Sequence, residues 1–329
     1  MRSVVFLPCH PNMWDGFETI YDKEISVPDT EVTIIPIPTY DRNHDDTLAN
    51  AEYITEGYPE CLKITGLNDY DLSKKQPDRI YIQNISDSCN AGFTVHPHFY
   101  SSNLRNFTKD LVYIPYNCIT ELDPEYEDLR QYYGEILTPS TIVNANHIIV
   151  QSENTKNVYL ELIAGKNDLL KNEWTKKISF IDYPRKAILK KYSSDTVRYP
   201  SSWNAQLFNT DRSQKKTVLF CTSVFEILEN NRLALKKIKT TLDYYQNQKS
   251  NTALIWRPNR NLPEIIKKLR PELLNDFNLL LEYYTQNNIG ILDKTPSPTA
   301  PIILSHEYIG ADCGVKELFK STGKPCLPW

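Results

Sequence analysis

Short apolar runs recur along the whole chain, and a helix-like or irregular segment follows each of them. The runs are continuous rather than alternating, which is typical of parallel strands that are covered on both faces. They span 4–7, 32–35, 79–82, 111–114, 147–150 and 178–181, and then 217–221, 253–256, 289–292, 308–309 and 326–327. Strand–helix alternation of this kind predicts an α/β fold with βαβ units and parallel sheets.

The segments between the runs carry helix signals. Ser152 suits the N-cap of a helix that Gly165 can close. Apolar residues at spacings of three, four and seven over 225–245 predict one long helix with a single buried face. Pro271 is expected to divide a later helical run in two, and a short helix is expected at 315–322.

The length of 329 residues suits two domains of roughly 150 residues each. The strand–helix pattern stops between about Lys190 and Lys216, where the sequence becomes linker-like. We therefore predict an N-terminal Rossmann-like domain over 1–195 and a C-terminal Rossmann-like domain over 196–329. The stretch from Thr39 to Asp71 is irregular and is expected to be a long functional loop or an inserted excursion.

Two Rossmann-like lobes without a GxGxxG after the first strand point away from a dehydrogenase. They favour the two-lobed GT-B architecture of nucleotide-sugar and related transferases. In such a protein we expect ligands in the cleft between the lobes, outside the carboxyl ends of the strands.

Charge and cysteine usage limit the partners and the compartment. A net charge of -4 disfavours a nucleic-acid-binding protein. The seven cysteines are widely spaced without a CxxC, which predicts neither a disulfide framework nor a zinc site. No apolar stretch of about 18 residues occurs. We therefore expect a cytoplasmic protein with no metal and no cofactor, which meets the inner face of the cell membrane only peripherally.

Three groups of segments carry a resemblance that covers nearly the whole chain. They are 6–8, 13–15 and Glu18; then 35–43, 96–104 and 111–116; and finally 254–258, 270–273, 308–310 and 322–325. Together they resemble the CDP-glycerol glycerophosphotransferase family of the teichoic-acid polymerase type, in a divergent subgroup. The resemblance implies a GT-B-like transferase that moves a glycerophosphate-type group from a CDP-linked alcohol to a cell-envelope glycan or lipid-linked acceptor. A GT-B protein normally continues into a further helix where this chain stops at Trp329, so two alternatives are open there: a truncated C-terminal domain or a short variant.

The sequence departs from the family pattern at two places. Arg257-Pro258-Asn259-Arg260 replaces Arg-Pro-His-Pro, and Ala311-Asp312-Cys313-Gly314 replaces an acidic residue followed by two serines. Two alternatives therefore stay open. One is a catalytically degenerate homologue that binds a nucleotide or a partner protein. The other is a GT-B glycosyltransferase that uses a nucleotide-sugar.

Candidate donor-binding residues follow the strands of the second half. Thr222 and Ser223 come directly after the run 217–221, where hydroxyls and amides suit phosphate contact or helix capping. Arg257 can fork onto phosphate oxygens. Asn259 can donate hydrogen bonds but cannot transfer protons.

The segment 310–316 reads as a strand, a tight turn and a helix. A helix N-terminus suits a diphosphate because its N–H groups are free and its dipole end is positive. In this turn Asp312 suits a ribose hydroxyl or a plain N-cap, Cys313 lies next to it, and Gly314 allows backbone to approach a ligand. The resemblance implies that these positions bind the donor.

Candidate catalytic residues follow the first apolar run. His10 and Asp15 suit a general base and its orienting partner for an acceptor hydroxyl. The alternative is a loop histidine and a capping carboxylate.

Candidate acceptor contacts lie in the long loop after the second run and in an aromatic stretch beyond it. They are Asp41, Arg42 and His96. The pair His96 and His98 has the spacing of metal ligands, but no carboxylate or cysteine completes a set, so packing or acceptor contact is expected.

Overall fold

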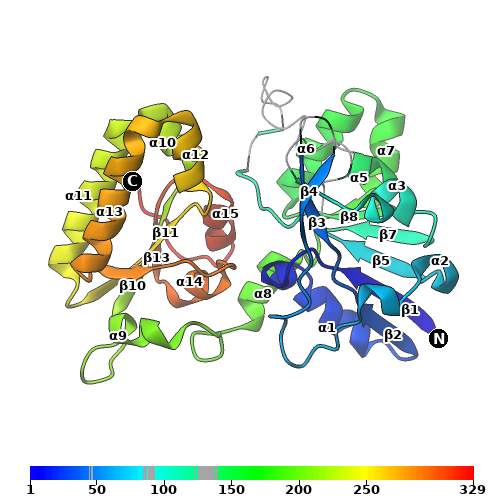
Figure 1. The fold of residues 1–329 in the computed structure, drawn as a ribbon, viewed down its shortest axis with the longest axis horizontal. Coiled ribbons are helices and arrows are strands. Elements are labelled where there is room, and N and C mark those ends of the chain that lie inside the picture. The colour runs from blue at the N-terminus through cyan, green and yellow to red at the C-terminus, as the bar shows by residue number, and fades with distance from the viewer. Residues whose placement is uncertain are drawn as a thin grey trace. The chain divides into compact units, whose positions relative to one another are not determined.

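The protein is described from a computed structural model that covers residues 1–43, 45, 47–83, 87, 93–121, 123, 124, 137 and 140–329. Cys89 lies outside these residues. The chain forms two compact units, which are coloured along the chain in Figure 1. Unit 1 comprises 1–117 and 121–188, and unit 2 comprises 118–120 and 189–329.

Unit 1 contains a six-stranded parallel sheet in the order β2-β1-β5-β7-β8-β9. Its strands are β1 (Arg2–Leu7), β2 (Thr30–Ile34), β5 (Arg79–Ile82), β7 (Asp110–Tyr113), β8 (His147–Ile149) and β9 (Ile178–Ser179). Each coincides with a predicted apolar run. In β1 the residues from Val4 to Leu7 are all fully buried, as expected for a strand covered on both faces.

The described helices of unit 1 fill the connections between its strands. They are η1 (Pro11–Gly16), α1 (Glu18–Ser26), η2 (Leu67–Asp69), α2 (Leu72–Lys75), η3 (Pro97–Phe99), α3 (Ser101–Leu104), α5 (Ser140–Asn144), α6 (Glu153–Ala164), α7 (Asp168–Lys177) and α8 (Pro184–Lys191). Helix α6 begins and ends as predicted: Ser152 Oγ accepts the Thr155 N–H at 3.0 Å, and Gly165 closes the helix with a φ of 51°.

Of the two alternatives for 39–71, the beginning of the stretch agrees with an inserted excursion rather than with an irregular loop. Strand β3 (Thr39–Arg42) pairs antiparallel with β4 (Leu48–Glu52) and with β6 (Phe93–Val95) in a separate three-stranded sheet. Strand β4 is half-exposed or exposed throughout, so it lacks the apolar pattern that reveals a strand. The second partner, β6, follows far along the chain.

Unit 2 contains a four-stranded parallel sheet in the order β12-β11-β10-β13. Its strands are β10 (Lys216–Thr222), β11 (Thr252–Pro258), β12 (Gly290–Leu292) and β13 (Glu307–Gly310). Cys326 adds a parallel bridge to Tyr308, at the place of the last predicted run. The fold class is therefore α/β with two Rossmann-like units.

The helices of unit 2 cover both faces of this sheet. They are η4 (Ser201–Trp203), α9 (Asn204–Leu207), α10 (Val224–Asn230), α11 (Arg232–Gln248), α12 (Leu262–Leu269), η5 (Pro271–Leu273), α13 (Leu274–Gln286), α14 (Thr299–Leu304) and α15 (Gly314–Lys320). Helices α11 and α13 lie on one face and α14 and α15 on the other (Figure 1). Alternate residues of β10 follow this division, because Phe220 packs toward α11 and α13 whereas Cys221 packs toward α14 and α15.

Two helix predictions have different outcomes. The single long helix over 225–245 is wrong, because Asn231 adopts a φ of 50° and separates α10 from α11. Phe225, which was expected on the buried face, is 61% exposed. Pro271 divides α12 from α13 as predicted.

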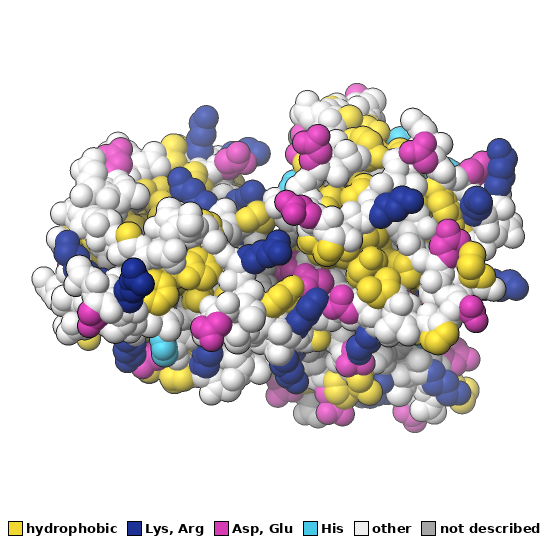
Figure 2. All heavy atoms as spheres, turned by 90° about the horizontal axis from the view of Figure 1, so that it is seen from below, with side chains coloured by type: hydrophobic (Ala, Val, Ile, Leu, Met, Phe, Trp, Pro, Cys, Tyr) yellow, Lys and Arg dark blue, Asp and Glu magenta, His cyan; other side chains and the backbone are white. Residues whose placement is uncertain are grey.

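Among the described helices, not one is long and apolar enough to cross a membrane. Figure 2 shows basic and acidic side chains interspersed over one face of the molecule. This distribution agrees with the mildly negative net charge.

Candidate functional site

The carboxyl ends of the four parallel strands of unit 2 meet at one edge of the sheet. Thr222 is the last residue of β10, and Arg257 is the second-last residue of β11. Asp293 directly follows β12, and Ala311 directly follows β13. This edge is where open α/β sheets bind ligands. The fold therefore brings the predicted donor residues together within one unit.

The residues after β10 are held by the chain itself. Thr222 is buried, its hydroxyl accepts the Trp256 indole N–H at 3.3 Å, and its carbonyl accepts the Asn259 N–H at 2.9 Å. Ser223 Oγ accepts the Glu226 N–H at 3.2 Å and caps α10. The structure thus shows the capping role of Ser223, and a phosphate contact there stays a prediction.

Arg257 has a charged partner that the sequence analysis missed. Its Nη1 forms an ion pair with the carboxylate of Asp293, which is 3% exposed. The same nitrogen donates to the Thr295 carbonyl at 2.9 Å, and Nη2 donates to the Pro296 carbonyl at 3.0 Å. Asp293 in turn accepts the Thr295 N–H at 2.8 Å. Its position directly after an apolar run is the signal that could have found it.

This pairing compensates the positive charge of Arg257 and fastens the guanidinium to the loop after β12. Within the described residues the hydrogen bonds of Arg257 involve Nη1 and one hydrogen of Nη2. Its Nε hydrogen and the second Nη2 hydrogen are the donors left for a ligand.

Asn259 shapes the turn after β11. Its backbone N–H donates to Thr222, and its Oδ1 accepts the Asn261 N–H at 3.0 Å. The amide nitrogen of its exposed side chain is the group that can face a ligand.

The turn before α15 differs from the expected anion cradle. Cys313, rather than Asp312, occupies the N-cap position. The Asp312 side chain is 69% exposed and pairs with Lys316. At Gly314 a Cβ would lie 2.1 Å from the carbonyl oxygen of Cys118. What approaches Gly314 closely is therefore a backbone segment of the same unit.

The Cys313 sulfur lies among polar groups, and the Tyr308 hydroxyl is 3.5 Å from it. Its interactions with the Cys221 thiol, the Tyr308 hydroxyl and the backbone N–H groups of Lys316 and Val315 outweigh burial and lower the pKa of the Cys313 thiol to about 6. Cys313 makes no side-chain capping hydrogen bond to α15. A phosphate contact at this turn stays a prediction.

The predicted catalytic pair of unit 1 lies in the 3-10 helix η1 after β1. His10 caps η1, because its Nδ1 accepts the Asn12 N–H at 3.0 Å. In the neutral form its proton is then on Nε2, so a base function would require this hydrogen bond to break. Asp15 is buried, and its Oδ2 lies 3.7 Å from Nε of the buried Arg185.

Arg185 belongs to a cluster that sequence reasoning missed. Its Nη1 donates to the Tyr116 carbonyl at 2.9 Å, and its guanidinium lies 4.2 Å from the centre of the Tyr116 ring. Asp15 comes from η1, Tyr116 from the segment after β7, and Arg185 from α8. No local sequence signal joins them.

Gln83 extends this cluster at the end of β5. It is 3% exposed, and its Nε2 donates to the Met13 carbonyl at 3.1 Å. Its Oε1 has no hydrogen-bond donor among the described residues. A buried acceptor without a donor is rare in folded proteins, so Gln83 is a candidate contact for a hydroxyl group.

The predicted acceptor contacts lie on the antiparallel sheet. Asp41 Oδ2 accepts the Asn50 side-chain amide at 2.8 Å, and Arg42 Nη2 donates to the Tyr100 hydroxyl at 2.8 Å. His96 caps η3 by accepting the His98 N–H at 3.2 Å.

His96 also lines a cavity of about 650 Å³, which Asp41 and Arg42 do not line. The other lining residues are Ile35, Pro38, Tyr40, Leu67, Asn68, Tyr70, Asp71, Leu72, Ser73, His98 and Phe99. Within the part of the chain that is described, no three or more His, Cys, Asp and Glu side chains are grouped to hold a metal ion.

Comparison with known proteins supports the fold through structure alone. No family model matches the sequence, and no curated protein matches it. The protein is similar to S. aureus MnaA in a co-structure with UDP (11% identity, 100% of this chain, 79% of that chain, TM-score 0.50). It is also similar to the UDP-GlcNAc 2-epimerase of Methanocaldococcus jannaschii (13% identity, 100% of this chain, 83% of that chain, TM-score 0.51). A third similar structure is the wall teichoic acid polymerase TagF (11% identity, 99% of this chain, 69% of that chain, TM-score 0.52). At these identities the likeness shows the fold: two Rossmann-like units of the GT-B type.

Proposed function

We propose that unit 2 binds a nucleoside-diphosphate-linked donor at the carboxyl edge of its parallel sheet, and that unit 1 binds the acceptor. The observation that carries this proposal is the convergence of Thr222, Arg257, Asn259 and the turn at Asp312 on one strand edge of a GT-B-type unit. Solved structures of the same fold support the ligand class. One is a complex of the M. jannaschii epimerase with UDP-GlcNAc and UDP, and another is TagF soaked with CDPG.

The charges at this edge decide where the phosphates of the donor would lie. The Cys313 thiolate would repel a phosphate from the turn before α15. On the neighbouring strand ends, Arg257 keeps two N–H hydrogens and Asn259 keeps its amide nitrogen. We therefore assign the phosphate contacts to Arg257 and Asn259. The exposed Asp312 carboxylate remains our candidate for a ribose hydroxyl.

The reaction we propose is transfer of an alditol phosphate from a CDP-linked alcohol to a glycan or lipid-linked hydroxyl. The hydroxyl attacks the donor phosphorus and CMP leaves, while Arg257 stabilises the charge that develops on the phosphate oxygens. The acceptor would contact unit 1 at the cavity beside His96 and at the group of His10, Asp15 and Gln83. The buried Gln83 oxygen can accept a hydrogen bond from a hydroxyl.

Calorimetry with the full chain tests the donor site. CDP-glycerol, CDP-ribitol and UDP-GlcNAc are titrated separately, and we expect at least one to bind. Arg257→Lys should weaken that binding about tenfold. Lysine lacks the planar guanidinium that pairs with Asp293, and it also lacks the Nε and Nη2 hydrogens that are left for the donor phosphates. Arg260→Lys is the control, since Arg260 is exposed in the same loop. Absence of binding by all three compounds would remove the proposal.

A turnover assay separates a transferase from a binding protein. CMP release from CDP-glycerol, and UDP release from UDP-GlcNAc, are measured with the natural chain and with Asn259→His. Release by the natural chain supports the proposed reaction. Release by the histidine variant alone would show that the natural chain binds without turnover, because Asn259 cannot carry a proton.

A further inference from the structure

Two cysteines meet at the carboxyl edge of the unit 2 sheet. Cys221 is the sixth residue of β10, it is 3% exposed, and it faces the side covered by α14 and α15. In the parallel pair with β13 it lies opposite Gly310, and its carbonyl accepts the Ala311 N–H at 3.0 Å. The chain then turns through Asp312, and Cys313 packs against the same apolar cluster as Cys221.

The two cysteines share one set of neighbours. Cys313 packs against the apolar cluster that contains Cys221 and Tyr308, and the Tyr308 hydroxyl lies 3.5 Å from the Cys313 sulfur. The interaction between the two thiols also lowers the pKa of Cys313. Tyr308 is fully buried, so it holds Cys313 from the core side, while Cys313 itself is partly exposed. Cys313 is thus the more exposed of the two residues, and Cys221 is the more shielded.

The environment also divides the protons between the two groups. The interaction with Cys221 and the neighbouring donors lower the pKa of Cys313, whereas burial raises the pKa of Cys221 well above its ordinary value. Cys313 is therefore the cysteine of the pair that loses its proton more readily. A reactive, accessible thiolate beside a second cysteine is the arrangement found in peroxide-sensitive proteins.

We propose that Cys313 and Cys221 are a peroxide-oxidised dithiol that closes to an intrachain disulfide. The Cys313 thiolate attacks one oxygen of a hydroperoxide, the O–O bond breaks, and Cys313 becomes a sulfenic acid while the peroxide is reduced to hydroxide or alkoxide. The Cys221 sulfur then attacks the sulfenic sulfur, the S–O bond breaks, and the Cys221 proton leaves with the hydroxyl as water. With hydrogen peroxide, two thiols and one peroxide give one disulfide and two waters.

The remaining described cysteines are placed differently. Cys9 is buried, and burial raises the pKa of its thiol to about 12. Cys61 is exposed. Cys118 and Cys326 are partly buried against the same apolar cluster as Cys221, which makes them matched controls.

Peroxide oxidation of the reduced, full-length protein tests the proposal. After treatment with hydrogen peroxide and non-reducing digestion, mass spectrometry should find the peptides of Cys221 and Cys313 linked, and dithiothreitol should separate them. Before oxidation, Cys313 should react with iodoacetamide at neutral pH about two- to fourfold faster than a cysteine with the ordinary thiol pKa, because its larger thiolate fraction outweighs the lower nucleophilicity of that thiolate. In Cys221→Ala the sulfenic acid should persist and be trapped by dimedone, and Cys118→Ser and Cys326→Ser should oxidise as the natural chain does.

Three results would overturn the proposal. They are a dominant linkage that involves another cysteine, oxidation of Cys313 beyond sulfenic acid while Cys221 stays a free thiol, and alkylation of Cys313 no faster than that of Cys61. If the Cys221→Ala protein does not fold, the disulfide linkage found in the natural chain is sufficient to test the proposal. Because these measurements follow sulfur chemistry, their outcome is independent of nucleotide binding.

Discussion

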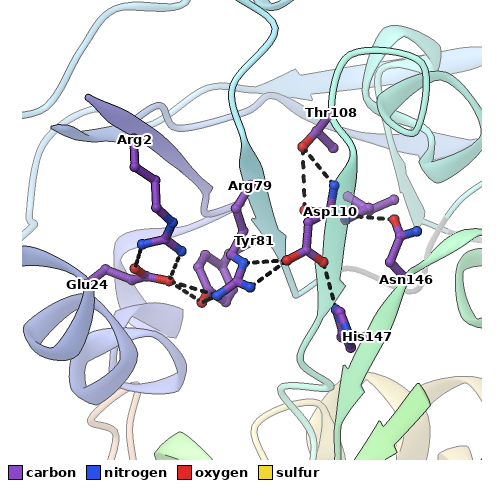
Figure 3. Close-up of polar contacts among 9 residues, drawn as sticks. Arg2, Glu24, Arg79, Tyr81, Thr108, Asp110, Asn146 and His147 are labelled. Carbon is purple, nitrogen blue, oxygen red and sulfur yellow. Dashed lines mark hydrogen bonds and ion pairs between the residues drawn. The ribbon is translucent and has the colours of Figure 1, made fainter. Parts of the chain in front are cut away.

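Single charged residues at the amino ends of the unit 1 strands form a connected chain of ion pairs. Figure 3 shows Glu24 of α1 between Arg2 and Arg79, and Asp110 between Arg79 and His147. The residues Arg2, Arg79, Asp110 and His147 are the first residues of β1, β5, β7 and β8. Ligands in this fold class bind at the carboxyl edge, so we assign this network to stability.

The Glu24 carboxylate is the most buried member of this network, and its loss should be costly. It is 5% exposed, and Oε1 accepts the Tyr81 hydroxyl at 2.6 Å and Arg79 Nη1 at 3.1 Å. Glu24→Gln places an amide among cationic donors, and we expect a loss of about 2 kcal/mol in the free energy of unfolding. Urea denaturation measures it, with the exposed Glu52→Gln as control.

The same substitution should change the pH dependence of stability. Although burial opposes it, hydrogen bonds from Arg2 and Tyr81 lower the pKa of Glu24 in the folded protein. A carboxyl with a lowered folded pKa stabilises the protein above its unfolded pKa of about 4.3, and this stabilisation is lost as the pH falls through the folded pKa. The Gln variant should therefore lose less stability on acidification below about pH 4. Equal losses in the two proteins would contradict the assignment.

At the scale of elements, backbone geometry at the end of β13 shapes the candidate donor edge. Gly310 adopts a φ of 116°, and a Cβ there would lie 2.1 Å from the Cys221 carbonyl oxygen. The ends of β10 and β13 are therefore in close contact, just before the turn that carries Cys313. The glycine is required by packing as well as by conformation.

Gly310→Ala should destabilise unit 2 more than a glycine substitution at a similar φ in open space. Gly323 also has a positive φ, 74°, but no atom lies within 4 Å of a Cβ built there. Gly323→Ala should cost about 1 kcal/mol of conformational strain, and Gly310→Ala about 2 kcal/mol more, because β10 and β13 must separate. Denaturation curves of the two variants give the difference. Equal losses would show that the strand contact is not the constraint.

At the scale of the whole molecule, the two units are not consecutive halves of the sequence. Residues 118–120 belong to unit 2 although unit 1 surrounds them in the sequence. The Cys118 carbonyl contacts Gly314 at the start of α15. A fragment that begins at Leu189 would therefore lack part of unit 2.

We expect nucleotide binding to stabilise the two units unequally. A ligand that binds the native state at 100 times its dissociation constant adds about 2.7 kcal/mol to stability. Hydrogen exchange of the full chain, with and without the nucleotide that binds in calorimetry, should show increased protection in β10, β11 and the loop after β12. Protection confined to unit 1 would contradict the placement of the donor in unit 2.

The local sequence was sufficient for the parallel strands, the ends of α6 and the α/β class. Residues 4–7 and 217–221 are continuously apolar because both faces of a parallel strand are buried, and burial of this kind is visible in any short window. Ser152 and Gly165 mark the ends of α6 because caps act within one helical turn.

Tertiary structure alone decided the polar partners and the antiparallel sheet. Strand β4 has no apolar signal, and the pairs Asp15 with Arg185, Arg257 with Asp293 and Cys221 with Cys313 join residues from elements that are distant in the sequence. These partners depend on strand order, which places distant segments side by side. Strand order follows from how the faces of all elements are buried together, so no single segment encodes it.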